Sequence, residues 1–370
     1  MTSGARPAAD AAVTIRPAPD SAVTIRPTAD SARTDRAGPA IVAGVDVGGT
    51  KVAVILVAAD GTTLARAVRP MRTRSAPDGI EPIVTTIRAA LDAAGTAVGD
   101  LVAIGVGVPG RVEADGVVRL AANLGWHDIP LAARLSAEFG VPCAVGNDVR
   151  AAASGLLDHE VAGGIRNLAY VAVGTGIGAG LVLDGRLRLG SRGMAGEIGH
   201  VVVEPDGVTC TCGQRGCLET VASGPAIARR AAEALAAGGS SVLRDVEPLS
   251  AKAVYEAAGA GDPLACAIVE EVGRVLARAI VGLVLTCDLE LVLLGGGVAG
   301  AGSVFLDPIL NHLAELRAGS PVVADMVPAG TVRSLPPVFD AVAWGGVALA
   351  RGVLGTPAAP GPGPAAPYSL

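Results

Sequence analysis

Short apolar runs that end in glycines recur along the chain, and this pattern constrains the fold more than any other feature. Ile41–Val47 precedes a glycine pair, Leu168–Val173 precedes a segment of alternating glycines, and Leu289–Leu294 precedes a glycine triplet. Buried strands of α/β proteins read as continuous apolar runs, and ligands bind beyond strand ends. Two sheet-opening glycine turns, one near the start of each half, predict an α/β fold with two lobes and a ligand between them.

The rest of the chain alternates between strand-like and helix-like segments. Further strands are predicted at 52–58, 62–69, 101–108, 141–145 and 179–183, and helices at 80–94, from 149 onward, at 225–237, at 263–285 and near 340–354. We expect a small lobe over 41–148, completed by the C-terminal helix, and a large lobe over 149–339.

Both ends of the chain are predicted to be disordered tails. Residues 1–40 contain a ten-residue repeat interrupted by prolines, which fits neither a helix nor a solenoid unit. Residues 355–370 are rich in Pro, Ala and Gly. The first tail is too short and too rich in proline for a DNA-recognition domain.

Charge and hydropathy exclude several classes of partner. The net charge is -6 and no dense basic patch occurs, so nucleic acid is not an expected partner. Mean hydropathy is +0.51, but the most apolar stretch, Ala279–Cys287, is far shorter than the roughly 20 residues that span a bilayer. With no secretory signal recognisable, the chain is expected to be cytoplasmic and independent of membranes.

The most specific pattern is a cluster of one imidazole and three thiols. His200, Cys210, Cys212 and Cys217 lie within the segment 200–217 and match the Cys₃His set of structural zinc sites. The alternative is that the thiols are reduced and unliganded. A zinc ion held by four protein ligands would fix this loop, and Glu197 and Glu219 flank it, where carboxylates can hydrogen-bond sugar hydroxyls.

Glycine turns at strand ends are candidate phosphate sites. In the segment 46–51, Gly48, Gly49 and Thr50 offer backbone and hydroxyl donors, Lys51 follows them, and Asp46 can hold Mg²⁺ through water. The alternative is a plain hairpin turn. The turns after the next two strands could hold the nucleotide in the same way, and their residues are Gly174, Thr175, Gly176, Gly295, Gly296 and Gly297.

A strand and an Ala-rich helix meet at Asn147-Asp148. A carboxylate there can accept the proton of a sugar hydroxyl as the hydroxyl attacks a phosphoryl group. Asn and Asp are also the preferred helix N-caps, and the two interpretations are compatible.

Taken in order, the motifs DVGGTK at Asp46, VGTGIGAG at Val173, GEIGH at Gly196 and CTCGQRGCLE at Cys210 resemble those of the ROK family, which groups sugar kinases with related repressors. The likeness runs from about Ile41 to Gly352 and is strongest to bacterial glucokinases. It implies an actin-like (ribonuclease H-like) two-lobe ATPase fold with a zinc-binding loop, closing over ATP and a hexose.

The resemblance also implies roles for individual residues. Asp148 would be the general base on the sugar 6-hydroxyl, and the sugar would be bound by Asn123, Asn147, Asp148, Glu197, His200 and Glu219. His200 would also ligate the zinc, and the glycine turns would surround ATP and Mg²⁺. The family often has Glu-Asn-Asp-Ala-Asn where this chain has Gly146-Asn147-Asp148-Val149-Arg150, so the rim of the pocket is expected to differ.

The expected reaction is glucose plus ATP to glucose 6-phosphate plus ADP. Alternatives are a kinase for N-acetylmannosamine, mannose or fructose, and a sugar-sensing repressor. Polyphosphate as a further phosphoryl donor stays open, and the family-like expectation for assembly is a homodimer or homotetramer.

Overall fold

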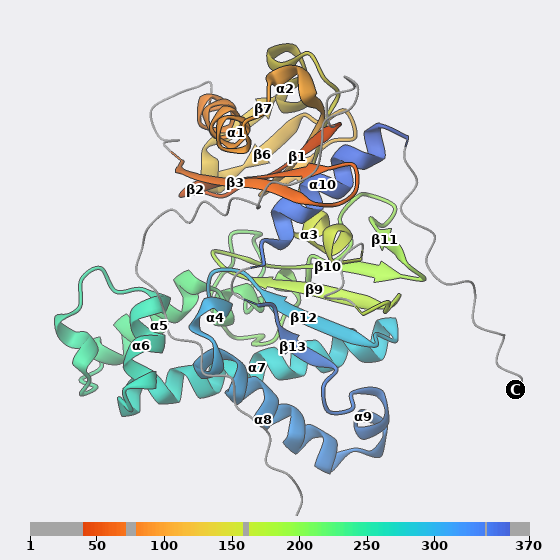
Figure 1. Ribbon diagram of the computed structural model, residues 1–370. Coiled ribbons are helices and arrows are strands. Elements are labelled where there is room, and N and C mark those ends of the chain that lie inside the picture. Colours follow the sequence, from red (N-terminus) through yellow and green to blue (C-terminus); the bar gives the residue numbers. More distant parts are fainter. Residues whose placement is uncertain (1–39, 72–78, 158–162, 337–338, 356–370) are drawn as a thin grey trace, which may run out of the picture.

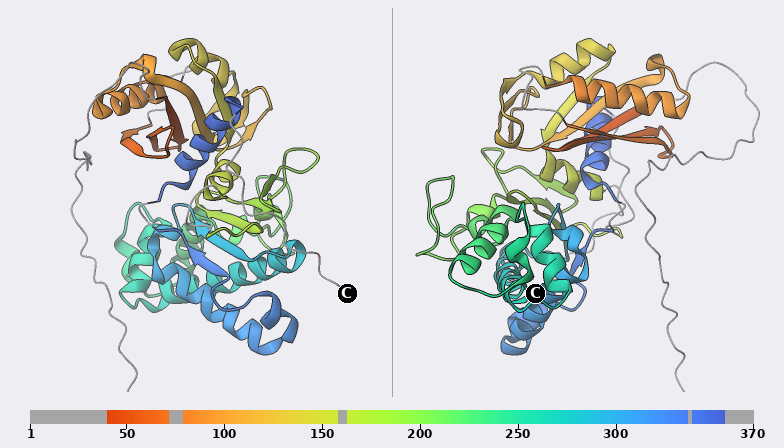
Figure 2. Two further views of the ribbon diagram at one scale, coloured as in Figure 1. Left: turned by 45° about the vertical axis from the view of Figure 1, so that its right-hand side comes forward. Right: turned by 90° about the vertical axis from the view of Figure 1, so that its left-hand side faces the viewer.

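The protein consists of two α/β lobes joined side by side (Figure 1 and Figure 2). The computed structural model describes residues 40–71, 79–157, 163–336 and 339–355. The two predicted tails therefore lie almost wholly outside the described residues. Within the described ranges no helix is long and apolar enough to cross a membrane.

The first lobe is built on a five-stranded sheet in the order β3-β2-β1-β4-β8. β1 pairs antiparallel with β2 and parallel with β4. β2 pairs antiparallel with β3, and β4 pairs parallel with β8. The strands are β1 (Ile41–Val47), β2 (Lys51–Ala58), β3 (Thr63–Pro70), β4 (Leu101–Val108) and β8 (Cys143–Asn147).

The second lobe repeats this pairing scheme in the order β11-β10-β9-β12-β13. β9 again pairs antiparallel with the next strand and parallel with a later one. Its strands are β9 (Leu168–Val173), β10 (Ile177–Leu183), β11 (Arg186–Arg188), β12 (Leu291–Gly295) and β13 (Val332–Ser334). The turns β1–β2 and β9–β10, which contain the first two glycine motifs, therefore occupy equivalent places in the two lobes.

Successive side chains of a strand point to opposite faces of its sheet, so the two faces of each sheet pack into separate hydrophobic cores. On β1, Ala43 and Val45 pack with α1 (Glu81–Ala94) and α2 (Leu131–Phe139), whereas Val42 packs with α10 (Ala341–Val353). On β9, Val171 packs with the helices of the second lobe and Leu168 packs with α3 (Asp148–Leu157). Those helices are α4 (Glu219–Ala222), α5 (Gly224–Ala236), α6 (Ala251–Gly259), α7 (Pro263–Cys287), α8 (Ser303–Gly319) and α9 (Pro321–Met326).

Helices α3 and α10 lie against each other between the two sheets, and α10 returns from the end of the chain to cover β1 and β4 (Figure 1). Small residues allow this close packing. A Cβ atom on Gly105 of β4 would lie 1.9 Å from the carbonyl oxygen of Gly346, and one on Gly155 of α3 would lie 2.4 Å from the backbone nitrogen of Gly345. Because α3 begins at Asp148, this carboxylate lies where the lobes meet.

The strands predicted at 41–47, 101–108 and 168–173 have these bounds in the structure. The bounds predicted at 141–145 are wrong: β8 covers Cys143–Asn147, because its pairing with β4 continues to Val108 and Asn147. The strand predicted at 289–294 begins later, at Leu291, because Asp288 adopts a left-handed conformation that ends α7.

A small sheet of β5 (Arg111–Val112), β6 (Val118–Ala121) and β7 (Trp126–Ile129) was not predicted. It lies between β4 and α2 along the chain, and the short turn Ala122–Leu124 between β6 and β7 carries Asn123.

Candidate active site

The junction of β8 and α3 fixes one oxygen of the Asp148 carboxylate. Asn147 is the helix N-cap, since its side-chain oxygen accepts a hydrogen bond from the backbone N–H of Arg150 at 3.2 Å. Its amide group donates to Asp148 Oδ1 at 3.0 Å, and the backbone N–H of Val149 donates to the same oxygen at 2.9 Å. The capping role therefore belongs to Asn147, and the second oxygen of Asp148 can face a ligand.

Burial raises the pKa of Asp148 above the ordinary aspartate value of 3.8. The hydrogen bond from Val149 and the positive charge of Arg150 offset part of this effect. A carboxylate with a raised pKa is a better proton acceptor than an exposed one while it is still ionised at neutral pH.

Other buried ionisable groups surround the same corner. Burial, followed by the charges of Asp340 and Asp148, raises the pKa of Asp46 to about 8. Asp340 caps α10 and forms an ion pair with Arg66 at 3.2 Å. Tyr170 of β9 is 5% exposed, and burial raises the pKa of its hydroxyl group. Such a concentration of carboxylates favours a bound cation, and Asp46 fits the predicted Mg²⁺ contact through its oxygen donors.

The turn between β9 and β10 is held in place from both lobes. Thr175 Oγ1 accepts a hydrogen bond from the Asn123 amide of the first lobe at 3.0 Å. The backbone N–H of Ile177 donates to Glu219 Oε2 at 3.0 Å, and the backbone N–H of Gly224 donates to the carbonyl oxygen of Gly174 at 2.7 Å. Glu219, the first residue of α4, therefore contacts the glycine turn and the cavity at once.

Glu197 and Arg150 form an ion pair at the cavity wall. Arg150 Nη2 lies 3.0 Å from Glu197 Oε1, and Arg150 Nε donates to the carbonyl oxygen of Ala195 at 3.4 Å. The Arg150 side chain is only 13% exposed, while that of Glu197 is 43% exposed. This ion pair joins the first turn of α3 to the segment that leads into His200.

The four predicted metal ligands come together. Ligand atoms of His200, Cys210, Cys212 and Cys217 all lie within 4.8 Å of one another. His200 Nδ1 is 3.6 Å from Cys210 Sγ, and the sulfur atoms of Cys212 and Cys217 are also 3.6 Å apart. In a tetrahedral zinc site with ~2.3 Å metal–sulfur bonds, neighbouring ligand atoms are roughly 3.8 Å apart. The donor set and its spacing fit a structural zinc ion.

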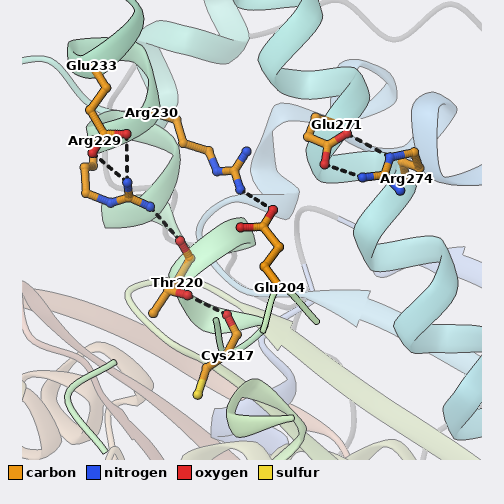
Figure 3. Close-up of polar contacts among 8 residues, drawn as sticks. All are labelled: Glu204, Cys217, Thr220, Arg229, Arg230, Glu233, Glu271 and Arg274. Atoms are coloured by element: carbon orange, nitrogen blue, oxygen red, sulfur yellow. Dashed lines mark hydrogen bonds and ion pairs between the residues drawn. The ribbon is translucent and has the colours of Figure 1, made fainter. Parts of the chain in front are cut away.

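Side-chain contacts tie the metal loop to the helices behind it (Figure 3). The Thr220 hydroxyl donates to the carbonyl oxygen of Cys217 at 2.7 Å, and Arg229 of α5 donates to the carbonyl oxygen of Thr220 at 2.7 Å. Arg230, the next residue of α5, forms an ion pair with Glu204 at 2.7 Å. The loop is thus anchored to α5 by two arginine side chains.

A cavity of about 1720 Å³ lies between the lobes. Small-molecule sites are typically ~300–1,000 Å³, so this one has room for two substrates. Predicted site residues that line it are Asp46, Asn123, Asn147, Asp148, Gly174, Thr175, Gly176, Glu197, His200, Glu219, Gly296 and Gly297.

The remaining predicted nucleotide residues do not line the cavity wall. Gly48, Gly49, Thr50, Lys51 and Gly295 fall outside it. The backbone N–H of Gly48 donates to the carbonyl oxygen of Lys51 at 2.9 Å, as in an ordinary hairpin turn. A Cβ atom on Gly49 would lie 3.5 Å from the carbonyl oxygen of Asn123, so this hairpin adjoins the residue that contacts Thr175.

Comparison with known proteins gives the family. The sequence profile of the ROK family matches residues 42–334. The chain belongs to the ROK family. A glucokinase from Halalkalibacterium halodurans is 39% identical over 279 residues, which are 73% of this chain and 84% of that protein. An N-acetylmannosamine kinase from Yersinia pestis (strain Pestoides F) is 33% identical over 260 residues, which are 69% of this chain and 82% of that protein.

Solved structures of ROK proteins confirm the predicted fold class. A ROK family glucokinase from Streptomyces griseus, in complex with glucose and AMPPNP, superposes with a TM-score of 0.69 at 32% identity. The match covers 84% of this chain and 99% of that one. The two-lobed actin-like architecture of this ROK protein was therefore predicted correctly.

Two residues of the cavity wall, Tyr170 and Arg150, and one residue beside it, Asp340, were missed or undervalued in the sequence. Tyr170 reads as an ordinary strand residue, and Asp340 lies far along the chain from its neighbours. Arg150 was noted only as a departure from the family pattern, because nothing in the sequence pairs it with Glu197.

We predict ~one tightly bound zinc ion per chain of this ROK protein, measured by metal analysis after dialysis. Cys217→Ser should lose most of the metal because it removes one of four ligands. Cys143→Ser is the matched control, since Cys143 lies in β8 outside the cluster and should leave metal content unchanged. A folded wild-type protein without zinc would contradict the site.

Proposed function

We propose that this ROK protein is an ATP-dependent glucokinase that transfers the γ-phosphoryl group of ATP to the 6-hydroxyl of glucose. One observation carries the proposal: Asp148 and the residues predicted to bind sugar line the same cavity as the glycine turn 174–176. The glucokinase relative and the glucose-bound ROK structure support the choice of glucose and ATP.

The sugar subsite lies around the start of α3. Asn147, Glu197, His200 and Glu219 offer carboxylate, amide and imidazole groups, which match the donors and acceptors of hexose hydroxyls. Asp148 would accept the proton of the 6-hydroxyl group while the oxygen of that hydroxyl attacks the γ-phosphorus. The bond between this phosphorus and the β–γ bridging oxygen breaks, and ADP leaves. Phosphoryl transfer of this kind depends mainly on positioning and charge neutralisation.

The nucleotide would lie between the turn 174–176 and the glycines after β12. Backbone N–H groups in such turns bind phosphate oxygens. Mg²⁺, held near Asp46, would neutralise phosphate charge when bound. Further phosphate contacts would come from the first hairpin once the first lobe moves closer to the turn 174–176; its residues are Gly48, Gly49, Thr50 and Lys51. The hydrogen bond from Asn123 to Thr175 already connects the two lobes at this place.

The zinc ion would influence the binding of sugar and nucleotide by fixing the conformation of the loop 200–217. His200 would be a metal ligand and a sugar contact. Glu219 follows Cys217 by two residues and also accepts the hydrogen bond from Ile177 in the nucleotide turn. The loop therefore contacts both the proposed sugar subsite and the proposed nucleotide turn.

A second candidate is the same reaction on N-acetylmannosamine, which the similarity to N-acetylmannosamine kinases favours. A coupled ADP-release assay over glucose, mannose, fructose and N-acetylmannosamine separates the two. Highest kcat/KM with glucose supports the proposal, and highest kcat/KM with the N-acetylated sugar replaces it with the second candidate.

Asp148→Asn tests the assigned base. It should lower kcat with glucose by ~10²–10⁴-fold, because the amide cannot accept the proton. The folded state binds the Asp148 proton more tightly than the unfolded state, so the carboxylate destabilises the fold at neutral pH. The variant should therefore keep or exceed the wild-type Tm. Asp92→Asn, on exposed α1 surface, is the control, and near-normal turnover of Asp148→Asn would remove the assignment.

The pH profile of kcat/KM for glucose gives an independent prediction. Asp148 must be ionised to act as a base, so the rate should fall as pH drops through its pKa. Since burial raises that pKa, the acidic limb should lie above the ordinary aspartate value of 3.8. A rate that stays constant down to pH 4, with the protein still folded, would contradict this role.

A further inference from the structure

Arg150 occupies a position where a cation is unfavourable by itself. It is the third residue of α3, and its backbone N–H is the one that Asn147 caps. The first turn of a helix carries the positive end of the helix dipole, which destabilises a nearby positive charge. Its side chain is also only 13% exposed, and a buried charge requires a partner. The partner is Glu197.

The guanidinium group contacts the segment 195–200 at two points. It forms the ion pair with Glu197 Oε1 at 3.0 Å and donates to the carbonyl oxygen of Ala195 at 3.4 Å. The ion pair engages one carboxylate oxygen, so the other can accept a hydrogen bond from a sugar hydroxyl. In this ion pair both side chains line the cavity.

Other contacts of the segment 195–200 connect it to parts of the chain outside α3. The backbone N–H of Ala179 in β10 donates to the carbonyl oxygen of Gly196 at 2.7 Å. Gly196 has φ +93°, and a Cβ atom there would lie 1.8 Å from the carbonyl oxygen of Ala179, so only glycine fits. His200 joins the metal cluster. Of these contacts, those of Arg150 connect the segment to the helix that begins at Asp148.

We propose that Arg150 is a positioning residue of the hexose subsite: it orients Glu197 toward the sugar and holds segment 195–200 against the helix that carries Asp148. This inference rests on the proposed function and deepens it. A planar guanidinium group can contact a carboxylate and a carbonyl oxygen together, which a lysine ammonium group cannot reproduce in the same geometry.

The same charge acts on the proposed base. The positive charge of Arg150 lowers the pKa of Asp148, opposing burial. The other ionisable groups around Asp148 are Asp46, Asp340 and Tyr170, and the cations Lys51 and Arg66 act on Asp46. Removing the cation leaves the carboxyl groups without this counter-charge, so the pKa of Asp148 should rise further.

The test compares Arg150→Gln, Arg150→Lys, Glu197→Gln and the double variant Arg150→Gln/Glu197→Gln by steady-state kinetics at pH 8. Arg150→Gln should raise the KM for glucose at least tenfold and leave the KM for ATP within twofold. The KM for glucose of Arg150→Lys should lie between those of Arg150→Gln and the wild type. In the Glu197→Gln background, Arg150→Gln should raise the KM for glucose by less than a further threefold, because the carboxylate that Arg150 orients is already absent. Arg88→Gln, which removes an exposed ion pair between α1 and α2, is the control.

Two further readouts separate positioning from a general structural effect. Calorimetric titration of glucose without ATP should show the same tenfold loss of affinity in Arg150→Gln, and the acidic limb of its kcat/KM profile should move to higher pH. Unchanged glucose KM and affinity, an equal rise in the KM for ATP, or an undiminished effect in the Glu197→Gln background would overturn the proposal.

Failure of the proposed function has a different signature. A wild-type protein that binds glucose but releases no ADP with any hexose would remove the glucokinase assignment, and the glucose titration would still decide the role of Arg150. A wild-type protein that binds no glucose would overturn both.

Discussion

The transition from β8 to α3 is the constraint on which the site depends. Asn147 is the last residue of a strand in the first lobe and the N-cap of a helix that packs on the second lobe's sheet. The chain thus passes between the lobes within one residue, and Asp148 follows at the seam. Two donors fix one oxygen of this carboxylate, and the packing of α3 against α10 fixes the helix direction. The carboxylate proposed as the base is thus held at the cavity wall.

The repeated sheet topology places the two glycine turns at equivalent positions in the two lobes. In both lobes the first two strands form a hairpin, and a later strand pairs parallel with the first. The second turn lines the cavity, and the first hairpin adjoins Asn123, which also lines it. The hydrogen bond from Asn123 to Thr175 spans the gap between the lobes, and Glu219 connects the second turn to the metal loop. The residues proposed to contact phosphate, sugar and metal are therefore linked to one another by hydrogen bonds.

Features that depend on local sequence could be predicted, and those that depend on distant pairs could not. Continuous apolar runs gave β1, β4 and β9, because buried strands need such runs. The cluster of His200, Cys210, Cys212 and Cys217 was predictable because the spacing of these residues is itself the signal. Strands as short as Arg111–Val112 have no measurable period. Arg150 and Glu197 are 47 residues apart, and Asn123 and Thr175 are 52 apart, so only the folded chain shows that they are partners.

The central claim is that Asp148 activates the 6-hydroxyl of a hexose held by the metal-pinned loop. Phosphorus NMR of the product formed from glucose and ATP tests it most directly, because the phosphorus couples to the protons on the carbon that carries it. The account predicts glucose 6-phosphate from the wild type and no detectable product from Asp148→Asn in the same time. Phosphate on another hydroxyl, or equal formation of product by the variant, would contradict it.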